Sequence, residues 1–268
     1  MKHNSIKALS IQINLSGLSF CILNRTTHAI ELLERIVLEK KATPFELLNQ
    51  LKSFISVNEA MNQSFDTVTC IYQNELACLV PNSIFDDSKL ADYLKFNAKI
   101  LQSDFISYDS LVLNESANVY IPLVNINNYL FDVYGSFEYK HASSVLIETL
   151  LQRSNTHSED ALYINVNELH FEVVCVRNKR LEFYNSFEYT TKEDFIYYIL
   201  FTIEQLKLNP ERIKTYLSGQ IQETDELFEI AYKYIRHVSM VETSYSFKVE
   251  GTANRGNDHD HFILLNSF

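Results

Sequence analysis

A pattern of strands and helices occurs twice along this chain, which limits the folds that it can adopt. Three strand-like runs open each half, and the first of them alternates apolar and polar residues as a half-buried strand does. The runs are 9–15, 18–24 and 29–39 in the first half, and 161–167, 169–177 and 180–189 in the second. The two sets align without a gap, from Ile13 with Ile164 to Ile36 with Phe187. We therefore expect a duplicated unit; the alternative is two unrelated α/β segments that share hairpins.

A capped helix follows the third run in each half. Thr43 as N-cap, Pro44 at the first helical position and Glu46 in a capping box predict a helix that begins at Pro44. Thr191 with Asp194 predicts the same kind of start for a second helix. A further strand and helix follow in each half, at 66–73 and 87–100 and at 212–219 and 223–238. Each half is thus expected to fold as β-β-β-α-β-α.

The stretch between the two halves sets the expected domain boundaries. We expect a first lobe over 1–153, with an inserted subdomain at about 81–139, and a second lobe over 161–268. The polar stretch 154–160, SNTHSED, is the expected hinge between the lobes.

Charge and composition exclude several classes of protein. A net charge of −11 disfavours nucleic-acid binding, which needs a basic surface. Because no apolar run approaches about 18 residues, we expect no membrane span, and we expect no secretion signal. The four cysteines have no C-x-x-C spacing, which is typical of reduced thiols in a cytoplasmic protein. They are Cys21, Cys70, Cys78 and Cys175.

Two copies of a β-β-β-α-β-α unit, each opening on a hairpin, resemble the duplicated ribonuclease H-like fold of the actin-like ATPase superfamily. The finer pattern is similar to an uncharacterised bacterial family with this fold. It also resembles bacterial division and pilus-assembly actin homologues, which carry an inserted subdomain in the first half. The resemblance is carried by LSIQINLSGLSFCIL, LACLVPNSIFDDSKLADYLKFN, LYINV and YNSFEYTTKEDFIYYILFTIEQLKLNPE. It implies an α/β protein of two lobes.

The resemblance implies that the two hairpin turns are the place for nucleotide phosphates. Active members of the superfamily carry an Asp-x-Gly motif there, in which aspartates organise magnesium and backbone amides hold phosphate oxygens. Asn14 and Asn165 stand at the aspartate positions, and Ser16 and Asn167 at the glycine positions, with Gly17 one residue further on. Because an amide oxygen brings no charge to a metal, the loss of both carboxylates weakens the expected binding of magnesium-ATP.

The adenosine loop of the superfamily is expected at Ser218-Gly219-Gln220, where one glycine of the usual pair is present. The water-orienting residue of active members would fall in 73–75. With five glycines in 268 residues, the chain has few to place in phosphate loops. No catalytic residue or metal ligand is assigned, and ATP with magnesium is the cofactor that the resemblance implies. The candidate nucleotide-binding residues are Asn14, Ser16, Gly17, Asn165, Asn167 and Gly219.

Other motifs have structural interpretations. Residues 257–262, NDHDHF, gather two histidines and two aspartates, yet we expect a solvated loop that enters a last strand over 261–268 rather than a metal site. His141 and His170 have no identifiable catalytic partner, so we expect structural roles for them. The many aromatic residues of 183–201 are expected to be core rather than a surface for stacking bases.

Three functions are compatible with these patterns. The first is a non-catalytic or degenerate actin-like protein that serves as a scaffold or adaptor for an unidentified protein partner. The alternative is an ATP-binding ATPase or kinase with a rearranged magnesium site. Gly17, Gly219 and a water-orienting Gln73 or Glu75 would support it. The third is a small-ligand sensor. Fold analogy by itself does not choose among them, because one fold hosts many functions.

Overall fold

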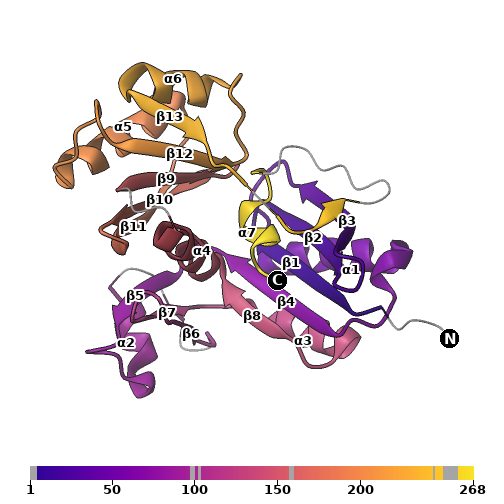
Figure 1. Cartoon of the computed structure of the whole chain (residues 1–268). Coiled ribbons are helices and arrows are strands. Elements are labelled where there is room, and N and C mark those ends of the chain that lie inside the picture. Colours follow the sequence, from indigo (N-terminus) through magenta and orange to yellow (C-terminus); the bar gives the residue numbers. More distant parts are fainter. Residues whose placement is uncertain (1–4, 97–99, 102–103, 157–159, 244, 250–258) are drawn as a thin grey trace. The chain divides into compact units, whose positions relative to one another are not determined.

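The computed structural model describes residues 5–96, 100–101, 104–156, 160–243, 245–249 and 259–268 (Figure 1). The chain divides into two compact units. Of the described residues, the first unit holds those up to Leu146 together with 245–249 and 263–268. The second unit holds 147–243 and 259–262. Each unit has a sheet and an apolar core of its own.

The first unit is built on a sheet of six described strands. Its elements are β1 (Lys7–Asn14), β2 (Gly17–Asn24), β3 (Ala29–Val37), α1 (Pro44–Val57), η1 (Glu59–Met61), β4 (Thr67–Gln73), α3 (Val124–Tyr134), β8 (Glu138–His141) and β14 (Lys248–Val249). The strand order is β14-β3-β2-β1-β4-β8. β2 is antiparallel to β1 and β3, whereas β4 is parallel to β1 and β8 is parallel to β4.

The second unit repeats this arrangement. Its elements are β9 (Ala161–Val166), β10 (His170–Arg177), β11 (Arg180–Glu188), α5 (Lys192–Gln205), β12 (Lys214–Gly219), α6 (Glu226–Tyr234) and β13 (His237–Met240). The order β11-β10-β9-β12-β13 corresponds to β3-β2-β1-β4-β8, with the same strand directions. The predicted duplicated α/β fold is therefore confirmed.

The register of the two sheets corrects the alignment of the halves. A bulge in β3 lies opposite Ile22 and Leu23 of β2, and the matching bulge in β11 lies opposite Cys175 and Val176 of β10. When the bulges are superposed, the hairpin registers pair Asn14 with Asn167 rather than with Asn165. The gap-free alignment is wrong in the first two strands because the next loop spans 25–28 in the first unit but only Asn178 and Lys179 in the second.

The predicted helix caps are present in both units. The Thr43 side chain accepts a bond from the Glu46 amide, and the Glu46 carboxylate accepts one from the Thr43 amide. Thr191 and Asp194 form the same reciprocal pair at the start of α5. Since both helices begin with the same box, their positions can be compared one by one.

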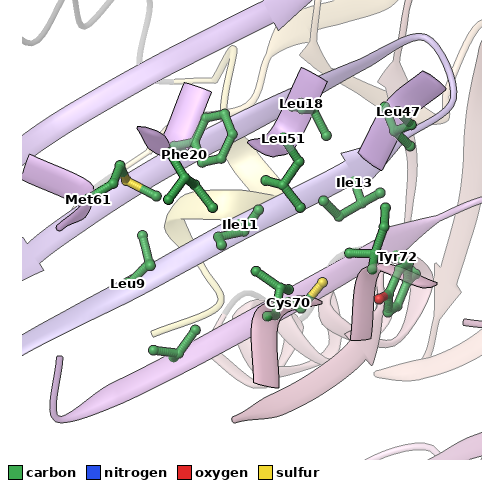
Figure 2. Packing of buried hydrophobic residues seen from close by; sticks show 14 of the residues in the cluster. Leu9, Ile11, Ile13, Leu18, Phe20, Leu47, Leu51, Met61, Cys70 and Tyr72 are labelled. Carbon is green, nitrogen blue, oxygen red and sulfur yellow. The ribbon is translucent and has the colours of Figure 1, made fainter. Parts of the chain in front are cut away.

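The core of the first unit lies between the sheet and α1. Leu9, Ile11 and Ile13 of β1 are no more than 1% exposed, and their side chains lie with Leu47 and Leu51 of α1 in one apolar cluster (Figure 2). These residues alternate along the strand, so one face of β1 is apolar as the sequence pattern predicts. This packing holds the end of β1, and with it the first hairpin turn.

A small sheet is inserted after β4. It consists of β5 (Ala77–Pro81), β7 (Ser116–Tyr120) and β6 (Ser107–Leu111) in the order β5-β7-β6, with η2 (Asp87–Lys89) and α2 (Leu90–Leu94) beside it. The insert was expected over 81–139, but α3 belongs to the main core and β8 pairs with β4. The helix expected over 87–100 is short, and part of that stretch, 97–99, lies outside the described residues.

The C-terminal stretch differs most from the expected boundaries. The second lobe was expected to hold all of 161–268, yet β14 pairs with β3 of the first unit and the Ser267 hydroxyl lies 2.6 Å from that of Ser10. The last strand expected over 261–268 is wrong, because Phe262–Leu265 forms a helical turn, α7. The units divide within helix α4 (Ala142–Thr156), while 157–159 of the expected hinge lie outside the described residues.

Candidate functional site at the hairpin turns

The turn of the first hairpin lies one residue earlier than the sequence suggested. Asn14 pairs with Gly17, so the turn consists of Leu15 and Ser16, and Gly17 is the first residue of β2. Gly17 does not have the positive φ that favours glycine. A Cβ atom at this position would collide with the carbonyl oxygen of Ile36 on β3. Close approach of the neighbouring strand therefore requires the glycine, whether or not a phosphate binds.

The Asn14 side chain closes this turn from within. Its Oδ1 atom accepts bonds from the Ser16 amide and the Ser16 hydroxyl, each at 3.0 Å. Its Nδ2 atom donates to Oε1 of Gln73 at 3.3 Å, and the same oxygen accepts a bond from Gln12 at 2.8 Å. The turn carbonyls of Leu15 and Ser16 accept bonds from the amides of Ala42 and Leu38. The Ser16 amide, which a phosphate loop would direct at a ligand, is thus bound to the chain itself.

Neighbouring residues of the candidate water-orienting segment 73–75 make contacts with different parts of the structure. Gln73, at the end of β4, is 4% exposed and lies against Asn14. Asn74 instead donates to the carbonyl of Ile121 at 3.1 Å and accepts a bond from the amide of Leu76. The fold therefore joins Gln73 to the first turn and directs Asn74 toward the inserted sheet.

The second hairpin is organised by a carboxylate that sequence reasoning missed. Glu172 on β10 is 3% exposed, and its Oε2 atom accepts bonds from Nδ2 of Asn165 at 2.9 Å and of Asn167 at 2.8 Å. Across the hairpin, Glu172 is the partner of Asn165. The available signal was a single charged residue within the apolar run FEVVCV, since a buried carboxylate needs dedicated partners.

Further bonds fix this cluster on both sides. The Ser218 hydroxyl donates to Oδ1 of Asn165 at 3.0 Å, and the Nε2 atom of His170 lies 3.6 Å from Oε1 of Glu172. The Tyr189 hydroxyl donates to the Asn167 carbonyl at 2.8 Å. A carboxylate is a preferred ligand of magnesium, but Oε2 of Glu172 already faces two amide groups. Within the described ranges, no group of three or more His, Cys, Asp or Glu residues could hold a metal ion.

The expected adenosine loop is covered by the chain's own C-terminal turn. The Gly219 amide donates to the carbonyl of His259 at 2.8 Å, and the Gln220 side chain donates to the carbonyl of Asp260 at 2.9 Å. The His259 ring nitrogen Nε2 donates to the Ile221 carbonyl at 2.9 Å. Residues 257 and 258 of the NDHDHF motif lie outside the described residues. The next two, His259 and Asp260, make the contacts with the expected adenosine loop.

Gly219 itself is required by the backbone. Its φ is +82°, and a Cβ atom there would collide with the carbonyl oxygen of Val166 and lie 3.0 Å from Oδ1 of Asn165. The structure thus brings Gly219, Asn165 and Asn167 together at one end of the second sheet. It likewise brings Asn14, Ser16 and Gly17 together at one end of the first.

A second buried carboxylate lies away from the hairpins, in the first unit. Asp109 on β6 accepts bonds from the Ser144 hydroxyl at 2.5 Å, the His141 amide at 2.7 Å and the Tyr120 hydroxyl at 3.0 Å. Burial raises the pKa of Asp109, and these bonds oppose the rise. The His141 ring accepts from the Ser143 hydroxyl at 2.7 Å and donates to the Asn74 carbonyl at 3.0 Å. These bonds tie the inserted sheet to the main one and give His141 a structural place.

The cysteines and most of the aromatic residues are structural. Burial raises the pKa of Cys70 to about 12 and that of Cys175 to about 11, so these thiols stay protonated. In the aromatic stretch, Phe195 is fully buried and Phe187 packs against the second core, as expected. Two members are exceptions: Tyr197 is 61% exposed and Phe201 is 45% exposed.

Comparisons with known proteins agree with this architecture. The family model of DUF3822, a protein of unknown function, matches residues 1–238, and no curated protein matches the chain. A Bacteroides thetaiotaomicron protein with an actin-like ATPase fold and unknown function is 22% identical, with a TM-score of 0.77 over 98% of this chain and 97% of that one. In the part of the chain that the structure describes, no helix is long and apolar enough to cross a bilayer.

Two further solved structures share the fold at lower identity. One is the PilM–PilN type IV pilus biogenesis complex, at 11% identity and a TM-score of 0.64, with 97% and 96% of the two chains covered. The other is the ethanolamine utilization protein EutJ from Carboxydothermus hydrogenoformans, at 6% identity and a TM-score of 0.50, with 97% and 88% covered. These likenesses confirm the actin-like ATPase fold.

Proposed function

The chain belongs to DUF3822, a family of proteins of unknown function, and we propose that it is a protein-binding scaffold whose phosphate turns no longer hold nucleotide. The observation that carries this proposal is the occupation of the turn amides. The amides of Ser16, Gly219 and Gln220 donate to Asn14, His259 and Val166 respectively. A phosphate loop works through backbone amides that point at the ligand, and these three point at the protein.

The charge at the turns supports the same proposal. Asn14 and Asn167 are matched by the strand register, and Asn165 lies beside Asn167, so amide groups stand where a magnesium site of this fold would need carboxylates. The buried carboxyl group of Glu172 accepts hydrogen bonds from two of these amides. A magnesium ion would have to displace those hydrogen bonds before it could bind the same oxygen.

A role in protein binding is supported by analogy and by surface chemistry. The structure of PilM, which shares the fold, is that of a complex with PilN. The described surface of this chain carries large exposed apolar side chains, some of them in the turns next to the inserted sheet, including Ile84 at 65% and Val112 at 77% exposure. The four free cysteines support a reducing location, and we place the protein in the cytoplasm.

One observation favours the alternative, an ATP-binding ATPase or kinase with a rearranged magnesium site. Glu172 supplies a carboxylate beside Asn165 and Asn167, although it comes from the neighbouring strand. In that case magnesium would be held by Glu172, and the Glu172→Gln variant would lose the ion while keeping the shape of the side chain.

Thermal unfolding with magnesium-ATP separates the two functions. A ligand at one hundred times its dissociation constant stabilises the folded state by about 2.7 kcal/mol. We expect no shift of the unfolding midpoint at millimolar ATP with magnesium. A shift that disappears in Glu172→Gln would instead establish the alternative. The scaffold itself is tested by cross-linking and affinity capture with the native chain in cells, and the absence of any specific partner would contradict it.

A further inference from the structure

The outward face of α5 carries an aromatic pair between two carboxylates. Glu193, Tyr197, Phe201 and Glu204 are all exposed, and their spacing places them on one side of the helix. We call these four residues the α5 stripe. The rings of Tyr197 and Phe201 are nearly parallel, at 17°, with centroids 6.2 Å apart. The stripe is thus a short apolar strip with an acidic residue at each end.

The duplicated fold provides an internal control for this face. Both α1 and α5 begin with a Thr N-cap and an acidic residue in a capping box, so Tyr197 corresponds to Asn49, and Phe201 to Ser53. Both counterparts are exposed in α1. The same helix position in the same fold therefore accepts small polar residues, so the fold itself does not require the aromatic pair.

The aromatic pair is supported by neighbouring rings. Tyr197 makes an edge contact with Tyr198 at 5.4 Å, and Tyr198 stacks on Phe187 at 4.9 Å, with an interplanar angle of 16°. Phe187 packs against the core of the second unit. Exposed aromatic residues held in one orientation lose little entropy when a partner covers them, which is the property of interface anchors.

We propose that the α5 stripe docks a basic amphipathic segment of a partner protein, with apolar side chains over Tyr197 and Phe201 and Lys or Arg beside Glu193 and Glu204. This proposal rests on the scaffold function and identifies the surface through which the scaffold would bind its partner. Charge complementarity selects the occupant, because a cation at each end would meet a carboxylate. Cationic side chains also stack favourably on aromatic rings.

The same charges disfavour the other occupants. The order along the stripe is acidic, aromatic, aromatic, acidic in either direction, so pairing with a second copy would place Glu against Glu whichever way the helices ran. With a net charge of −11, the chain is also repelled by anionic lipid and by nucleic acid.

The test uses synthetic helical peptides and the full chain. The first peptide has four residues at the same intervals as the α5 stripe, with Lys at the two outer positions and Leu at the two inner ones. The second peptide has Glu in place of each Lys. The stripe variant is Tyr197→Asn with Phe201→Ser, which installs the residues that α1 carries at the corresponding positions and leaves the charge unchanged. The matched control is Phe45→Asn with Phe131→Ser, two exposed aromatic residues of the first unit. Circular dichroism on heating verifies that each variant folds.

Binding is measured by fluorescence anisotropy of labelled peptide. We expect the Lys peptide to bind the native chain and the control alike, about tenfold more weakly to the stripe variant, and less tightly as salt rises. The proposal is overturned if the stripe variant binds within about twofold of the native chain, if the Glu peptide binds equally well, or if the Lys peptide does not bind. If the native chain and the stripe variant captured the same cellular partner equally well, the α5 stripe would not be the binding surface, but the scaffold function would be supported. If the Lys peptide bound to the stripe but no cellular partner was captured, the scaffold function would be contradicted and the binding preference of the stripe would be supported.

Discussion

The Oδ1 atom of Asn14 lies 3.0 Å from both the amide nitrogen and the hydroxyl oxygen of Ser16. One side chain therefore holds the turn that, in this fold, would be directed at a phosphate. Asn14 therefore has a structural role, and its substitution should lower the free energy of unfolding rather than weaken the binding of a ligand.

Replacement of Asn14 by Ala should lower the free energy of unfolding by about 1–2 kcal/mol, because the Ser16 amide and Gln73 lose a partner. Urea unfolding measures the change. Asn82→Ala is the control: Asn82 is exposed, and its substitution should cost less than about 0.5 kcal/mol. Equal effects of the two substitutions would show that Asn14 does not hold the turn.

Gly219→Ala should destabilise the protein more than Gly135→Ala. Both glycines have positive φ, +82° and +76°, so each substitution carries a backbone cost of about 1–3 kcal/mol. Only at position 219 does the new Cβ meet another group, the Val166 carbonyl, whereas at 135 there is nothing within 4 Å. The clash should add about 1–3 kcal/mol. Equal losses in urea unfolding would mean that the close approach of Val166 does not require this glycine.

Two substitutions at Glu172 separate its charge from its hydrogen bonds. Glu172→Gln keeps an oxygen for Asn165 and Asn167, and should change the free energy of unfolding by less than about 1 kcal/mol. Glu172→Leu removes this acceptor from both amide groups, of which that of Asn165 is buried, and should cost about 2–4 kcal/mol. If the two variants were equally stable, these bonds would not organise the hairpin.

The pH dependence of stability should report on Asp109. Burial raises its pKa in the folded state, so between the ordinary aspartate pKa of about 3.9 and the raised value the folded state holds more protons than the unfolded state. Stability due to this group therefore falls as pH rises through that window. Asp109→Asn cannot ionise, so its stability relative to the native chain should increase over the same window. Urea unfolding at a series of pH values measures this, and parallel curves for the two proteins would rule it out.

Local features such as helix caps could be predicted from the sequence. The residues that face one another across neighbouring strands could not. The Thr43–Glu46 and Thr191–Asp194 boxes are local signals, and both helices begin where these signals predict. The duplicated strand order could likewise be predicted from the recurring pattern. The match of Asn14 with Asn167 could not, because it depends on a shortened loop beyond the second strand and on the shared bulge.

The other features that the sequence did not predict also depend on the three-dimensional structure rather than on a local pattern. Glu172 meets Asn165 only across the β9–β10 pair, and Asp109 meets Ser144 only when the inserted sheet packs on α4. The apolar run Phe262–Leu265 is too short for periodicity to separate a helical turn from a strand.

Both turns bind the chain's own groups through the amides that would otherwise hold nucleotide. Isothermal titration calorimetry of the native protein with magnesium-ATP measures whether nucleotide still binds there. We expect no saturable heat up to millimolar nucleotide, where a dissociation constant of about 1 mM would correspond to a binding free energy of −4.1 kcal/mol. A saturable, magnesium-dependent isotherm with a dissociation constant in the micromolar range would contradict this expectation.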